Sequence, residues 1–117
     1  MESKNLARQI KIKTGSLNRS VKDYQSYAKE VTTQTAKVEQ LKQTCDDEGK
    51  VRQNEEALAE TIAMLPGCKA KIGQAREDLQ AHIDQVQEAD DFSKSEDYEK
   101  AVAAVAAADE FMATIWV

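Results

Sequence analysis

The sequence predicts an all-α fold, an elongated antiparallel three-helix bundle of the coiled-coil type. Apolar residues recur at seven-residue spacing along two long stretches of the chain. Ala, Glu, Gln and Lys dominate a composition with one Pro and 5% aromatic residues, which favours helices over sheet. The 117 residues suffice for one domain, and the narrow core of a bundle needs few large side chains. We therefore expect a single bundle over residues 1–117.

The first helix is expected over about residues 5–45, with Asn5 as its N-cap. Its apolar series steps by seven residues through Ile10, Leu17, Tyr24, Val31, Val38 and Cys45. Gly15 lies inside the helix and should cost roughly 1 kcal/mol relative to Ala. The first helix should therefore depend on packing for its stability.

The second helix is expected over about residues 50–89, after a break at residues 46–49 in which Gly49 can adopt a left-handed turn conformation. Its series is Val51, Leu58, Leu65, Ile72, Leu79 and Val86. This series keeps its phase through Pro66, so we predict one helix with a kink near Pro66. The short break makes the first two helices an antiparallel hairpin. In that hairpin, one core should hold Leu17, Tyr24 and Val31 together with Ile72, Ile83 and Leu65.

The third helix is expected over about residues 94–115 and is shorter than the other two. Ser93 and Glu96 have the spacing of a capping box at its start. Its expected apolar stripe is Tyr98, Ala101, Val102, Val105, Ala108, Met112 and Ile115. It should run parallel to the first helix and reach about residue 27. The bundle should then be two helices thick near residues 30–65, with more of its face open to water or to a partner.

The chain carries no recognisable signal peptide, and no apolar run approaches the length of a membrane span. Cys45 and Cys68 should lie about 26 Å apart along the hairpin, from the rise of 1.5 Å per residue. A disulfide needs Cα atoms within about 7 Å, so both cysteines should be reduced core thiols. We expect a soluble protein of a reducing compartment, with no membrane partner.

No arrangement of residues in the sequence indicates catalysis. His82 is the only histidine, and no second His or converging Cys supports a metal site. The sequence has no phosphate-binding Gly-rich loop and no nucleophile elbow. We therefore expect neither an enzyme nor a bound cofactor or metal.

The charge is distributed unevenly. Residues 1–30 carry seven Lys and Arg against three Asp and Glu, a net charge of +4, whereas residues 77–117 have a net charge of −9. The two regions could attract each other inside the bundle, or the basic region could offer a face to an acidic partner. Ile12 should point away from the first apolar series, although a single exposed Ile is ordinary on a protein surface. The candidate partner-binding residues are Arg8, Lys11, Ile12, Lys13, Arg19 and Lys22.

Two motifs resemble one known family. The run Arg8–Gly15 (RQIKIKTG), continued by Arg19, Val21 and Lys22, resembles the start of the tubulin-specific chaperone A family, also called tubulin-binding cofactor A. Met64–Cys68 (MLPGC) resembles that family's Met-Ile-Pro-Asp-Cys run in its second helix. The resemblance covers roughly residues 7–100. The apolar terminus Phe111–Val117 and the Ala/Val tract at 101–108 depart from the family pattern.

The resemblance implies a monomeric three-helix bundle that captures β-tubulin after its release from the chaperonin. Such a protein hands β-tubulin on for assembly of the αβ-tubulin heterodimer, with no nucleotide and no catalysis. It also implies a cytoplasmic location in association with the cytoskeleton.

Two other functions remain open from the residues alone. A structural coiled-coil protein would dimerise through its apolar seams, and its mass in solution would distinguish it from a monomeric bundle. A helical nucleic-acid-binding protein could use the basic region. The pI of about 4.9 and the few aromatic residues argue against nucleic acid as a partner.

Overall fold

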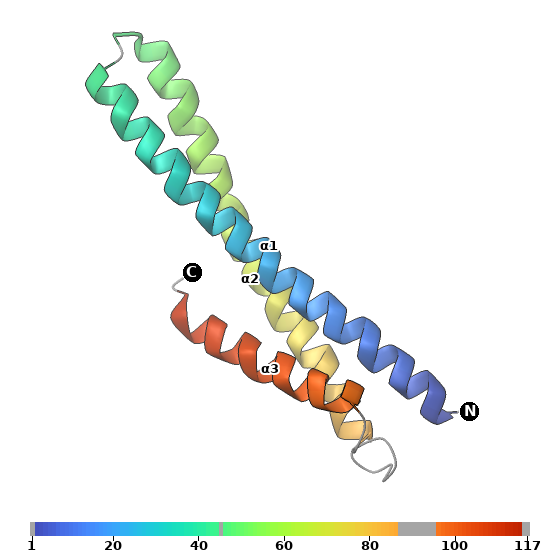
Figure 1. The fold of residues 1–117 in the computed structure, drawn as a ribbon. Coiled ribbons are helices and arrows are strands. Elements are labelled where there is room, and N and C mark those ends of the chain that lie inside the picture. The colour runs from blue at the N-terminus through green and yellow to red at the C-terminus, as the bar shows by residue number, and fades with distance from the viewer. Residues whose placement is uncertain (1, 45, 87–95, 116–117) are drawn as a thin grey trace.

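The computed structural model describes residues 2–44, 46–86 and 96–115, which form an elongated bundle of three helices (Figure 1). They are α1 (Glu2–Thr44), α2 (Glu48–Val86) and α3 (Glu96–Thr114). The molecule measures 67 × 21 × 19 Å, and its described part contains no strand. The predicted all-α fold class, with a third helix shorter than the others, is confirmed.

The beginnings of α1 and α2 differ from the sequence predictions. Because α1 begins at Glu2, Asn5 lies inside the helix and is not its N-cap. Asp47 caps α2: its Oδ1 accepts hydrogen bonds from the backbone N–H of Gly49 at 3.0 Å and of Lys50 at 3.3 Å. Gly49 lies in the first turn of α2 and does not use the left-handed conformation open to it, so the break between the helices ends at Asp47 and not at Gly49.

Pro66 lies within α2, and the helix continues on both sides of it. The bend expected there stays a prediction. The predicted end of the second helix near residue 89, the start of the third at residue 94, and the capping box that begins at Ser93 lie outside the described residues, as does Cys45. Cys68 is a buried free thiol.

The core lies in the half of the molecule where all three helices meet. Ile10, Leu17, Ile72 and Leu79 are completely buried, and Tyr24 and Ile83 join them in one cluster. Leu65 is partly buried against this cluster. Val31, which was expected in the same core, is half-buried and lies outside the cluster.

Helix α3 begins beside the N-terminal half of α1 and runs in the same general direction, ending about halfway along the rod (Figure 1). Its buried residues recur at helical spacing and are small, which permits close approach: Ala101, Ala104, Val105 and Ala108. Val102, expected in the stripe, is 44% exposed, because the buried face is centred on these four residues. The Phe111 ring contacts the Tyr24 ring edge-to-face at a centroid distance of 5.6 Å. Phe111, Met112 and Ile115 thus pack against the core.

The part of the hairpin beyond α3, formed by residues 30–44 of α1 and 48–65 of α2, is called the arm below. Apolar seam residues are only half-buried in the arm: Val31, Leu41, Val51, Leu58 and Leu65. Val38 differs from these residues, because it is buried with only 5% of its surface exposed. The arm also holds polar groups in its interior, namely Thr61, which is 7% exposed, and the Gln34 side-chain oxygen. The arm is therefore less completely covered than the three-helix part.

Candidate partner-binding surface

Three of the six candidate residues share one exposed face of α1. Arg8, Ile12 and Arg19 are separated by four and seven residues, spacings that return a side chain to nearly the same side of a helix. Ile12 is 54% exposed, and both arginines are exposed. Gly15 lies between them, and a side-chain carbon added there would meet no atom within 4 Å. These four residues are called the outer face below.

Lys11 and Lys22 lie nearer to α3 than the outer face does. Lys11 lines a small groove together with Asp97 and Lys100 of α3. Lys22 lines a larger groove together with Phe111. Both lysines are exposed, so they extend the basic surface from the outer face towards the third helix.

Lys13 lies on the side of α1 that meets α2 and is engaged within the molecule. Its Nζ donates a hydrogen bond to Asp78 Oδ2 at 2.9 Å, and its side chain is 22% exposed. The hydrogen bond and the positive charge of Lys13 hold the pKa of the Asp78 carboxyl below its ordinary value. The attraction between basic and acidic regions therefore operates at Lys13. None of the ion pairs between described residues involves Arg8 or Arg19.

The sequence prediction missed the second ion pair that joins two helices in the three-helix part. Arg76 of α2 donates to both carboxylate oxygens of Asp109 of α3, from Nε at 3.0 Å and from a terminal nitrogen at 3.1 Å. Hydrogen bonding to Asp109 raises the pKa of Arg76 above its ordinary value. The sequence shows that the two residues have opposite charges. Predicting that they form an ion pair also requires the register of α3 against α2.

The remaining reactive groups are dispersed over the described residues. His82 Nδ1 lies 3.1 Å from the carbonyl oxygen of Asp78, one turn earlier in the same helix. No cluster of three or more His, Cys, Asp or Glu side chains suited to a metal occurs within residues 2–44, 46–86 and 96–115. Burial raises the pKa of the Tyr24 hydroxyl, with a further contribution from Cys68. None of the described helices has a stretch both long and apolar enough to span a membrane.

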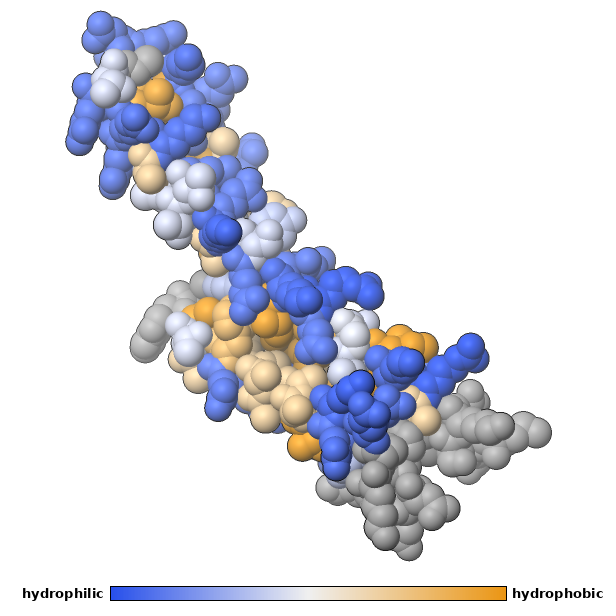
Figure 2. Space-filling view, viewed as in Figure 1, coloured by the Kyte–Doolittle hydropathy of each residue, from blue (hydrophilic) through white to orange (hydrophobic). Residues whose placement is uncertain are grey.

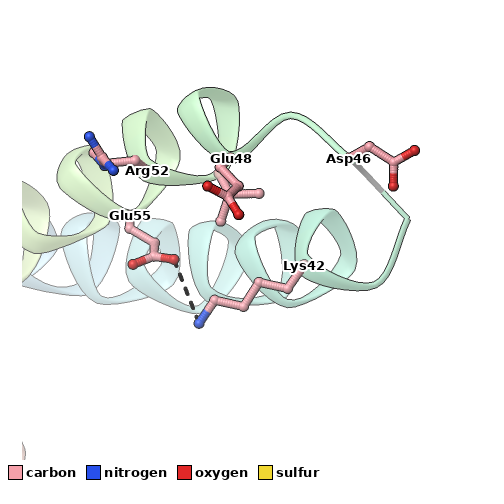
Figure 3. A pocket seen from close by; sticks show the side chains of 6 residues that line it. Lys42, Asp46, Glu48, Arg52 and Glu55 are labelled. Carbon is pink, nitrogen blue, oxygen red and sulfur yellow. Dashed lines mark ion pairs between the residues drawn. The ribbon is translucent and has the colours of Figure 1, made fainter.

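A hollow of about 560 Å³ lies at the tip of the arm (Figure 3). Side chains of both charges line it, with Val51 as an apolar contribution: Lys42, Asp46, Glu48, Val51, Arg52 and Glu55. Lys42 Nζ lies 3.7 Å from Glu55 Oε1, so this pair connects α1 to α2 at the tip.

The chain is a small helical hairpin, and a third helix packs along about half of its length (Figure 1). The family model described as Tubulin binding cofactor A matches residues 5–105, and the chain belongs to that family. It is similar to tubulin-folding cofactor A of Arabidopsis thaliana, with 35% identity over 100 residues that cover 84% of this chain and 88% of the relative. Tubulin-specific chaperone A of Gallus gallus is 36% identical over 95 residues, covering 80% of this chain and 84% of the relative.

Two solved structures share the fold. The crystal structure of tubulin folding cofactor A from Arabidopsis thaliana superposes with a TM-score of 0.82 at 30% identity, covering 91% of this chain and 97% of that one. The human tubulin chaperone cofactor A structure gives a TM-score of 0.72 at 30% identity, covering 89% and 98%. The family resemblance stated from the two sequence motifs is therefore confirmed. Residues 106–117 lie beyond the range that the family model matches.

Proposed function

We propose that this protein is a tubulin-folding chaperone that binds β-tubulin folding intermediates after their release from the chaperonin. It keeps them competent for assembly of the αβ-tubulin heterodimer. Membership of the Tubulin binding cofactor A family supports a role in tubulin folding. Relatives named tubulin-specific chaperone A and tubulin-folding cofactor A support the same role.

The protein acts by binding alone, as a cytoplasmic monomer associated with the cytoskeleton, without nucleotide, metal or catalysis. Its three-helix part covers its own section of the seam, which supports the monomer: Leu17, Ile72 and Leu79 are completely buried within one chain. A single chain that buries its own core has less to gain from dimerisation.

The outer face is the proposed contact for β-tubulin. The observation that carries this is the exposure of Ile12, 54%, between Arg8 and Arg19, neither of which forms an ion pair with another described residue. An apolar side chain flanked by two cations that form no ion pair with described residues fits an acidic partner surface with a small apolar centre. The cations mainly speed association, whereas an anchor that loses its water mainly slows dissociation.

Reversing the charge of the arginines and truncating Ile12 separate the contribution of the cations from that of the apolar anchor. We expect Arg8→Glu with Arg19→Glu to weaken β-tubulin binding more at low salt than at high salt, because the Debye length is about 10 Å at 0.1 M. Ile12→Ala should weaken binding with little salt dependence and little change in the free energy of unfolding. The measurement is a titration of β-tubulin at two salt concentrations.

A matched control reverses two exposed lysines away from the outer face, Lys37→Glu with Lys71→Glu, and changes the net charge equally. This control should bind β-tubulin nearly as tightly as the unmodified chain. If the outer-face variants retain full affinity while their helical circular-dichroism signal is intact, the outer face is not the contact.

A further inference from the structure

Helix α3 occupies a groove between α1 and α2, and the residues that line it identify the side of the hairpin on which it lies. In α1, Asn18, Val21 and Gln25 line a groove together with α3 residues. In α2, Arg76 and Ile83 line another groove with α3 residues, and Arg76 also forms the ion pair to Asp109. In a heptad pattern, these positions repeat on the same side of each helix every seven residues.

The same positions continue along the arm, beyond the end of α3. In α2, Ile62 lies two heptads before Arg76, and Glu55 lies three heptads before it. In α1, Lys42 lies three heptads after Val21. Lys42 and Glu55 meet at 3.7 Å and line the hollow at the tip (Figure 3). The side of the hairpin that α3 covers therefore continues along the arm, past Ile62, to the hollow at the tip.

This continuation, called the arm groove below, has apolar residues that no described segment covers. Ile62 is 47% exposed, and its neighbours Leu58 and Leu65 are only half-buried. The equivalent seam residues under α3, Ile72 and Leu79, are completely buried. Figure 2 shows apolar surface near the tip of the arm between strongly hydrophilic side chains.

The length of the arm groove suits a short helix. Near its C-terminal end α3 contacts Tyr24 through Phe111, and α1 extends from there to Thr44. Even from residue 28 to residue 44, α1 spans about 24 Å at 1.5 Å per residue, which matches a helix of roughly four turns.

We propose that the arm groove binds an amphipathic α-helix of the β-tubulin folding intermediate, docked end to end with α3. The argument for a helix is continuity, because the lower part of the same groove already holds one, α3. The rim carries both charge signs at its tip, Lys42 and Arg52 beside Glu48 and Glu55, which suits a helix with both charges along its apolar stripe. The inference rests on the proposed tubulin-folding function and assigns it a second contact surface.

Ile62→Ser tests the arm groove, and Met64→Ser is its matched control. The two side chains are 47% and 46% exposed and lie two residues apart in α2. Met64 lies on the opposite side of the hairpin, where it lines a groove with Tyr27 and Lys71. We expect Ile62→Ser to weaken β-tubulin binding at least about tenfold, equivalent to about 1.4 kcal/mol, and Met64→Ser to change it less than about twofold. Circular dichroism confirms that both variants are folded.

Hydrogen exchange supplies a second readout on the unmodified chain. Bound β-tubulin should slow amide exchange in residues 55–62 of the arm. Equal binding by the two variants, or unchanged exchange in the arm of a chain that does bind β-tubulin, would overturn the arm groove and leave the proposed function standing. Failure of the unmodified, folded chain to bind β-tubulin would overturn both.

A second copy of this chain is the rival occupant of the arm groove, and sedimentation of the chain alone tests for it. A dimer that Ile62→Ser dissociates would mean that a second copy of this chain fills the arm groove, and the proposal would be wrong. A monomer that still loses affinity for β-tubulin through Ile62→Ser supports it.

Discussion

The Lys13–Asp78 ion pair links α1 to α2 through residues 65 positions apart in the sequence. Lys13 holds the pKa of Asp78 below its ordinary value, so the folded state favours the ionised carboxylate. A carboxyl group with a lowered pKa contributes stability above its unfolded pKa, about 3.9, and loses it as the pH falls through the lower folded value. The pair therefore stabilises the hairpin at neutral pH.

Replacing Lys13 with Gln should reveal this dependence. The free energy of unfolding of Lys13→Gln should lie below that of the unmodified chain at about pH 6, and the difference should shrink towards zero at about pH 2. Urea denaturation across this pH range measures it. Lys11→Gln, at an exposed position that forms no ion pair with another described residue, is the control. A difference that stays constant with pH would show that Asp78 is not the partner.

At the residue scale, the sequence could predict which side chains are exposed but not which charged side chains form ion pairs. The helical period placed Ile12 opposite the seam, and Ile12 is exposed. The same reasoning grouped Lys13 with the exposed cations, although Lys13 pairs with Asp78. Pairing depends on the register between α1 and α2, which heptad spacing along each helix does not fix.

Helix α2 contributes Ile72 to the three-helix core. Its side chain is completely buried within the cluster that α1 and α3 complete. Ile72→Ala should lower the free energy of unfolding by about 2–4 kcal/mol through lost burial and the cavity left behind. Ile62→Ala, at a site 47% exposed in the same helix, should cost less than about 1 kcal/mol. A loss below about 0.5 kcal/mol at Ile72 would contradict its place in the core.

The arm contains one buried polar atom that has no hydrogen-bond partner among the described residues. The Gln34 side-chain oxygen is buried without a hydrogen-bond partner there, although its nitrogen donates to Glu30 at 3.3 Å. Because a buried unpaired acceptor is costly, Gln34→Leu should raise the free energy of unfolding by about 1 kcal/mol. Gln43→Leu, at an exposed position of the same helix, is the control and should change it little. Destabilisation by Gln34→Leu would mean that the amide oxygen is hydrogen-bonded in solution.

At the scale of the helices, periodicity predicted two long helices and one short one, but local capping altered the boundaries. The predicted start of the second helix at about residue 50 was two residues late, because Asp47 caps α2 and the helix begins at Glu48. The heptad pattern carried α2 through Pro66 correctly. Sequence periodicity records which face is apolar, whereas capping depends on which side-chain oxygen reaches a backbone N–H.

For the whole molecule, chain length and helix order indicated a rod with unequal thickness, and α3 does end about halfway along it (Figure 1). What could not be predicted was the direction in which each charged residue points around the rod. Arg8 and Arg19 share the outer face, whereas Lys11 and Lys22 lie towards α3. The position of α3 around the hairpin decides this division.

The mass in solution distinguishes a monomeric bundle from a coiled coil that dimerises through its seams. The proposed monomer should sediment at about the chain mass of 13.0 kDa at micromolar concentration. The control is Leu58→Ser in the arm seam, which should leave that mass unchanged. A concentration-dependent doubling of mass that Leu58→Ser abolishes would favour the structural coiled-coil alternative.

Capture of β-tubulin is the most direct test of the proposed function. Purified chain is added to β-tubulin as it leaves the chaperonin, and the mixture is separated by size exclusion without added nucleotide. One chain should co-elute with one β-tubulin, and the complex should release β-tubulin for heterodimer assembly when the other assembly factors and α-tubulin are supplied. If β-tubulin elutes without the chain while the chain remains folded, the proposed function is wrong.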